Sequence, residues 1–226
     1  MANNFKNAVR RNISSDSGLP TEIYAAPNTK KSIAIEIDVS NKSSAGVTVT
    51  VQLEDESLNQ TYNTTGTTIN ANASTVVPTT GVSGLFTTNS SAAHNLIVND
   101  RVMFTAGTAP SFTDASLPTS GETALSITRM YYVQSIPSTS TFTIAETKSG
   151  TLLTFDTTGS SVVFTKIHLA DIVKDAPVPV GGALKVIAGQ KLVLESLTAN
   201  VNDKIYAYAS GASACDVIAS VLEDVS

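Results

Sequence analysis

Two segments near the start of the chain alternate apolar and polar residues with a period of two. Residues 31–39 read Lys-Ser-Ile-Ala-Ile-Glu-Ile-Asp-Val, and residues 47–54 read Val-Thr-Val-Thr-Val-Gln-Leu-Glu. Successive side chains of a β-strand point to opposite faces, so the isoleucines and Val39 of the first segment share one face. The polar residues 40–46 separate the two segments. The pattern predicts a half-buried antiparallel strand pair.

Further short β-rich runs follow along the chain, and no long segment has a helical period. We therefore expect an all-β protein with an antiparallel β-sandwich. Two initial strands are too few for a stable sheet, so residues 21–65 are expected to pair with residues 167–226. Residues 66–166 are dense in Thr, Ser and Gly, and we interpret them as an inserted small β-barrel or β-sandwich domain. Residues 1–20 read as an extended N-terminal arm.

Charge is sparse in this chain of 226 residues. Charged residues make up 15% of it, below the typical quarter, and Ser and Thr together account for about a quarter. A polar surface with few charges to desolvate suits packing into large assemblies. The net charge of −5 provides no basic field, so we expect no nucleic-acid partner. No apolar run approaches a membrane span and the N-terminus lacks a signal-peptide core, so we expect no membrane partner.

Residues that could support catalysis or metal binding are few and scattered. His94 and His168 lack a second ligand at metal-binding spacing, and we interpret both as ordinary surface or turn residues. The acidic residues 54–56 read as a solvated turn rather than a calcium loop. The glycines in residues 177–182 favour a turn, and Cys215 is expected to be a small buried side chain. We therefore expect no cofactor, no metal and no enzyme activity.

The arm carries the one charge feature with a possible role. Its basic residues are Lys6, Arg10 and Arg11. One interpretation is a disordered soluble tail. The other is an arm that becomes ordered on a neighbouring subunit. In that case the candidate partner contacts are Phe5, Lys6, Val9, Arg10, Arg11 and Ile13.

Several segments resemble small virion structural proteins of tailed bacteriophages, notably phages of marine bacteria and cyanobacteria. The resemblance lies in residues 1–9, 22–27, 174–184, 190–195 and 203–208. Residues 94–105, 131–133 and 140–144 resemble a β-module that recurs in phage tail and fibre proteins, although the loop 106–123 is longer here. The resemblance implies a homo-oligomeric particle component whose partners are other virion proteins. A capsid decoration or cement protein is favoured over a neck, tail or fibre component.

A second hypothesis makes the insert an adhesin module that binds a host glycan. Its candidate contacts are Tyr131 and Tyr132, because aromatic rings can pack against sugars while their hydroxyls bond to polar groups. The preferred interpretation is that the two tyrosines straddle a strand, with one in the core and one at the surface. A glycan-degrading enzyme is a third hypothesis, which no set of catalytic residues supports.

Overall fold

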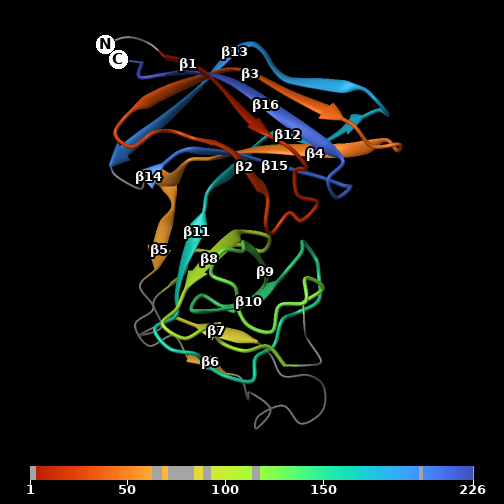
Figure 1. Cartoon of the computed structure of the whole chain (residues 1–226). Helices are drawn as coiled ribbons and strands as arrows, with labels where there is room; N and C mark the ends of the chain where they lie inside the picture. The colour runs from red at the N-terminus through yellow and green to blue at the C-terminus, as the bar shows by residue number, and fades with distance from the viewer. Residues whose placement is uncertain are drawn as a thin grey trace. The chain divides into compact units, whose positions relative to one another are not determined.

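The computed structural model describes residues 4–62, 68–70, 84–88, 93–113, 118–198 and 201–225. These residues form β-strands and one short 3-10 helix, η1 (Glu56–Leu58), and they contain no α-helix. The chain divides into two compact units (Figure 1). We call Met1–Leu58 with His168–Ser226 the sandwich unit, and Asn59–Ile167 the inserted unit.

The sandwich unit contains two antiparallel sheets. In spatial order, the five-stranded sheet consists of β1 (Asn4–Arg10), β16 (Cys215–Glu223), β3 (Lys31–Asn41), β13 (Ala183–Thr198) and β14 (Val201–Asn202). The four-stranded sheet consists of β12 (Leu169–Val178), β4 (Val47–Glu54), β15 (Lys204–Ala209) and β2 (Thr21–Ala25). Figure 1 shows the two sheets as stacked layers. The predicted all-β antiparallel sandwich is confirmed.

The core of the sandwich unit lies between these sheets. Ile37, Val39 and Val217 from the five-stranded sheet and Val49 and Val51 from the four-stranded sheet belong to one buried cluster. Burying one such side chain contributes roughly 1.5–3 kcal/mol. The apolar positions of both alternating segments therefore determine which faces of the two sheets meet.

The predicted pairing of the two alternating segments is wrong. They form β3 and β4, but β3 pairs with β13 and β16, whereas β4 pairs with β12 and β15. Residues 42–46 thus cross from one sheet to the other. At this crossing Nδ2 of Asn41 donates hydrogen bonds to the carbonyls of Ala45 and Val178, at 2.8 and 3.0 Å. The crossing lets the apolar faces of both strands enter one core from opposite sides.

The alternation within β3 is also interrupted. Ser220 pairs with Glu36 and Val221 pairs with Ala34, so Ile35 is an extra residue opposite β16. Such a β-bulge reverses the face on which the preceding side chains lie. Ala34 is consequently fully buried, whereas Ile33 and Ile35 are only half-buried. The prediction that all the isoleucines share the core face is wrong for these two.

Residues 4–10, which we expected to belong to an extended arm, form strand β1 of the chain's own five-stranded sheet. All seven residues pair with β16, from Asn4 opposite Glu223 to Arg10 opposite Val217. Ala8 is the one buried residue of the strand. Among the described residues β16 is its one strand neighbour, so the segment lies at the edge of the sheet.

The inserted unit is built on one curled antiparallel sheet (Figure 1). In spatial order its strands are β5 (Gln60–Tyr62), β11 (Val163–Ile167), β8 (Arg101–Thr105), β9 (Tyr131–Ser138), β10 (Thr141–Ala145), β7 (Leu85–Thr87) and β6 (Thr68–Asn70). The unit begins at Asn59, ahead of the expected residue 66, because β5 pairs with β11. Six of the seven phenylalanines of the chain lie in its core.

Candidate functional site

A row of apolar side chains crosses the outer face of the five-stranded sheet. The strand register places Phe5 opposite Leu222, Leu222 opposite Ile33, and Ile33 opposite Val193. Residues directly opposite on antiparallel strands have Cβ atoms about 4.5–5.5 Å apart and lie on the same face. The four side chains, which we call the apolar row, therefore form one continuous stripe over β1, β16, β3 and β13.

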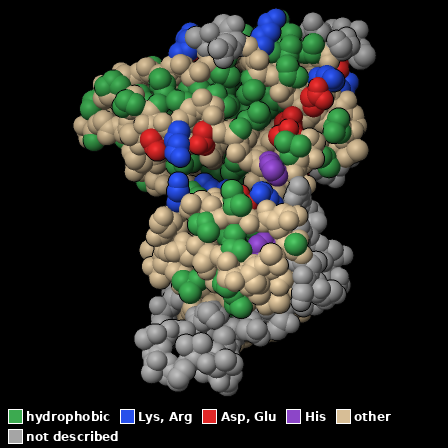
Figure 2. Space-filling view, turned by 180° about the vertical axis from the view of Figure 1, so that it is seen from behind, with side chains coloured by type: hydrophobic (Ala, Val, Ile, Leu, Met, Phe, Trp, Pro, Cys, Tyr) green, Lys and Arg blue, Asp and Glu red, His purple; other side chains and the backbone are tan. Residues whose placement is uncertain are grey.

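The two ends of the apolar row are the most exposed. Phe5 is 74% exposed and Val193 is 49% exposed, while Leu222 and Ile33 are half-buried. A neighbouring pair on the same face, Val9 opposite Ile218, is 45% and 44% exposed. Figure 2 shows green hydrophobic side chains at the surface of the sandwich unit. Contiguous exposed apolar side chains are typical of interaction surfaces.

A hollow of about 240 Å³ lies at the β13 end of this face. Val193 and Leu197 line it together with the acidic residues Asp55, Glu195 and Asp203. Burial raises the pKa of Asp203, and the carboxylate of Asp55 raises it further. Both oxygens of Asp203 accept backbone N–H groups, from Glu56 at 3.2 Å and from Glu195 at 2.9 Å. These two backbone hydrogen bonds fix the position of the Asp203 carboxylate at the hollow.

Two of the three basic candidate residues of the former arm bind within the sandwich unit. Nζ of Lys6 lies 3.2 Å from Oε1 of Glu223, and Nε of Arg10 donates to the carbonyl of Glu22 at 2.8 Å. Arg11 is exposed directly after β1. Lys6 is thus paired within its own sheet, and Arg10 reaches β2 of the four-stranded sheet.

Ile13 differs from the other candidate contacts of the arm. It is fully buried, and its backbone N–H donates to the carbonyl of Cys215 at 3.0 Å. Ile13 belongs to the core cluster of its own sandwich. In this structure it is an internal anchor of the chain, which leaves Phe5 and Val9 as the exposed apolar candidates.

Tyr131 and Tyr132, the candidate glycan contacts, are both buried, with 0% and 7% exposure. The hydroxyl of Tyr131 donates to Oε2 of Glu122 at 3.3 Å and accepts the N–H of Ser126 at 2.8 Å. The guanidinium of Arg101 lies 3.9 Å from the ring centre of Tyr132, a cation–π contact. The expectation that one of the two rings lies at the surface is therefore wrong. Both tyrosines serve internal packing.

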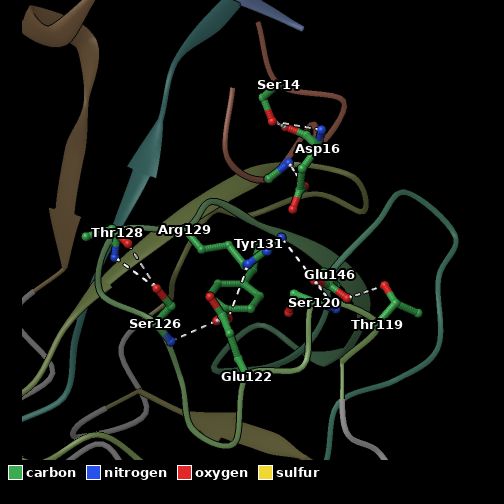
Figure 3. A network of polar contacts seen from close by, with 11 residues as sticks. Ser14, Asp16, Thr119, Ser120, Glu122, Ser126, Thr128, Arg129, Tyr131 and Glu146 are labelled. Carbon is green, nitrogen blue, oxygen red and sulfur yellow. Dashed lines mark hydrogen bonds and ion pairs between the residues drawn. The ribbon is translucent and has the colours of Figure 1, made fainter. Parts of the chain in front are cut away.

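The inserted unit contains an ionic network that the sequence did not reveal (Figure 3). Arg129 is 1% exposed, and its guanidinium lies 3.3 Å from Glu122 and 3.1 Å from Glu146. Glu146 also accepts hydrogen bonds from Thr119 and from the N–H of Ser120. The network joins the loop before β9 to the residue that follows β10. Its geometry, a buried cation between two acids, is that of a structural support.

One signal in the sequence could have indicated this network. Between Ser74 and Phe164 the chain has few charged residues, and Glu122, Arg129 and Glu146 are three of them. In a segment so poor in charge, each ionisable side chain that becomes buried must find a partner of opposite sign. The spacing alone could not show which residues meet.

The acidic residues 54–56 have a counter-ion within the chain, so the solvated turn that we expected needs correction. Glu54 is 3% exposed, and Nζ of Lys204 lies 3.7 Å from Glu54 and 3.2 Å from Glu56. Burial by itself would lower the pKa of Lys204, but the two carboxylates outweigh it and raise that pKa. Lys204 thus balances the charge of these two carboxylates within the chain.

Other features singled out in the sequence have structural roles. His94 is 1% exposed, contrary to the expected surface or turn position. Its Nδ1 accepts the N–H of Leu96 at 3.0 Å, so Nε2 carries the proton and faces the carbonyls of Ser138 and Thr141. The predicted turn after β12 is confirmed by a positive φ of 63° at Gly181. Among the described residues, no cluster of His, Cys, Asp and Glu could hold a metal ion.

Comparison of the chain with protein-family models, curated proteins and solved structures found no match. Within the described part of the chain, no helix is both long and apolar enough to span a membrane.

Proposed function

We propose that the chain is a structural subunit of a bacteriophage virion, a capsid decoration or cement protein. The observation that carries the proposal is the apolar row across the outer face of the five-stranded sheet. Phe5 and Val193 at its ends expose large fractions of their surface, whereas Ile37, Val39 and Val217 on the other face of the same sheet are fully buried in the core. Binding of another protein over such a sheet face is favourable, because it removes apolar surface from water.

The remaining surface of the sheet suits attachment to a large assembly. Beyond the apolar row the same face carries Asp38 and an ion pair between Lys185 and Glu36. An apolar stripe bordered by polar groups resembles the core and rim of protein interfaces. Many identical subunits that each bind weakly through such a face produce strong total attachment to a particle.

The proposal is tested by quantitative mass spectrometry of purified particles produced from the genome that encodes the chain. A capsid decoration protein is expected in copy numbers on the order of hundreds, because it covers a repeating shell. A dozen copies or fewer would favour the neck, tail or fibre alternative instead. Absence of the chain from the particles would overturn the virion role.

The role of the apolar row is tested by adding purified protein to particles that lack it. Phe5→Lys and Val193→Lys are expected to weaken attachment, because each places a charge where an apolar surface is covered. The matched control is Val180→Lys, which changes a 58% exposed valine in the turn after β12. Equal attachment of all three variants and the unaltered chain would show that another surface binds the particle.

A further inference from the structure

We infer that strand β1 pairs with β1 of a second copy of this chain, antiparallel and about a two-fold axis at Asn7. This inference rests on the structural-subunit role proposed above and names a partner for it. The dimer would join two five-stranded sheets into one continuous sheet. The partner and the register both follow from the edge strand itself.

Strand β1 is exposed at the edge of its sheet. Six of its seven residues, all except Ala8, are exposed, and among the described residues β16 is its one strand neighbour. An edge strand presents unpaired backbone N–H and C=O groups, which form a template for another strand. Proteins often block such edges with outward-directed Lys side chains. Here Lys6 and Arg10 are instead held by Glu223 and by the carbonyl of Glu22.

The side chains of β1 are complementary to themselves in one register. When Asn7 lies opposite Asn7 of the second copy, Phe5 lies opposite Val9, and Lys6 lies opposite Ala8. An aromatic residue opposite a β-branched residue is a favourable cross-strand pair, and it occurs twice about the two-fold axis. No two like charges are directly opposite.

The neighbouring registers lack this complementarity. The outer faces of the two copies lie on the same side of the joined sheet only when the two-fold axis passes through a residue. The neighbouring registers of this kind are centred on Lys6 and on Ala8. Centring the pair on Lys6 places Lys6 opposite itself, and centring it on Ala8 places Lys6 opposite Arg10. Like charges directly opposite destabilise strand pairing. Of these three registers, the pairing centred on Asn7 is therefore the one that places no like charges opposite each other, and it also forms the two Phe5–Val9 pairs.

This register also joins the apolar surfaces of the two copies. Phe5 ends the apolar row of one copy, and the facing Val9 continues through Ile218 on the second copy. The row of one sheet thus extends into the neighbouring sheet, and the symmetry repeats this arrangement. A larger apolar surface results for contact with the particle.

Solution mass provides the first test. We expect the full chain to form a dimer by light scattering coupled to size-exclusion chromatography. Phe5→Lys and Val9→Lys should each weaken the dimer about tenfold or more, since each change acts twice in a symmetric interface. Val180→Lys is the control and should leave the mass unchanged. A monomer at about 1 mM would overturn the proposal, because even weak pairing is populated at that concentration.

Cysteine cross-linking provides the second test and reports the register. Hydrogen-bonded and narrow pairs alternate along antiparallel strands, so either Asn7 with its copy or Lys6 with Ala8 forms a narrow pair. We expect Asn7→Cys or the Lys6→Cys/Ala8→Cys double variant to form a disulfide-linked dimer under mild oxidation. Phe5→Cys alone lies opposite valine and should not link. The unaltered chain should not link either, because Cys215 is fully buried.

The outcomes separate this inference from the virion role. A dimer that neither links through these cysteines nor responds to Phe5→Lys uses another surface and overturns the β1 pairing. A monomeric chain that is abundant in particles overturns the pairing and leaves the virion role intact. A cross-linked dimer that is absent from particles supports the pairing and overturns the virion role. Circular dichroism of each variant confirms that it is folded.

Discussion

Nη1 of Arg129 lies 3.1 Å from Oε1 of Glu146, and both side chains are buried in the inserted unit. Arg129→Met would leave Glu146 buried without its cation. We expect a loss of about 3–5 kcal/mol in the free energy of unfolding of this unit. Urea denaturation followed by near-UV circular dichroism of its phenylalanines measures the loss. Lys148→Met, at an exposed neighbouring position, should change stability by less than about 0.5 kcal/mol.

A double variant shows whether the loss comes from the ion pair. Arg129→Met combined with Glu146→Gln removes the uncompensated charge together with its partner. We expect the double variant to lose less than the sum of the two single variants. Additive losses would mean that the two side chains contribute independently.

Phe142 is expected to be a central packing residue of the inserted unit. Its ring stacks on Phe86, with centroids 5.2 Å apart and planes inclined by 11°, and both side chains are fully buried. Phe142→Ala should destabilise the unit by about 3–5 kcal/mol, because it removes buried apolar surface and leaves a cavity. Ile127→Ala, at a 54% exposed position, is the control in the same denaturation experiment. Similar losses in both variants would contradict the packing role of Phe142.

Ile13 should stabilise the sandwich unit, although it follows the exposed strand β1. Its side chain is fully buried, so Ile13→Ala is expected to cost about 2–5 kcal/mol. Val9→Ala, at a 45% exposed position in β1, should cost less than about 0.5 kcal/mol in the monomer. Thermal unfolding of the two variants at low protein concentration separates these effects. If Ile13→Ala were as mild as Val9→Ala, the segment after β1 would not be anchored as described.

Asp216 should make stability depend on acidity. Oδ1 of Asp216 lies 2.7 Å from Nζ of Lys42 and accepts the N–H of Asn12 at 2.9 Å. The hydrogen bond from Lys42 and that from the Asn12 backbone hold the pKa of this carboxyl below its usual range. A lowered folded-state pKa contributes stability above the unfolded-state pKa of about 3.9, and this contribution is lost as pH falls through the folded value.

We therefore compare the Tm of the unaltered chain with that of Asp216→Asn across pH. The unaltered chain should be the more stable one at neutral pH, and the difference should shrink below about pH 4. Lys42→Met should lower the Tm with the same pH dependence, because it removes the cation that is paired with the Asp216 carboxylate. A difference that stays constant down to about pH 2 would show that the charge of Asp216 is not responsible.

Cys215 should be unreactive in the folded chain. Its side chain is fully buried, and burial raises the pKa of the thiol, with a further increase from the carboxylate of Asp216. The reactive thiolate is therefore scarce and enclosed. A thiol-specific reagent should label Cys215 in denaturant and not in buffer, whereas Asn7→Cys should gain an accessible thiol in buffer. Rapid labelling of the unaltered folded chain would contradict the burial of Cys215.

The sequence alone determined the fold class and many of the strands. The alternation in residues 47–54 predicted a strand that the structure shows with the same bounds, as β4. The turn after β12 and the burial of Cys215 also followed from local composition. These features depend on neighbouring residues, whose side chains alternate or restrict the backbone within a few positions.

Tertiary structure alone decided which strands meet and which side chains are exposed. Strands β3 and β4 lie in different sheets, and the bulge at Ile35 turns Ile33 outward into the apolar row. Arg129, just before β9, meets Glu146, just after β10, and β1 pairs with a strand more than 200 residues away. Such pairings depend on the packing of the whole sheet, because a period-two pattern specifies a strand's faces but not its partner.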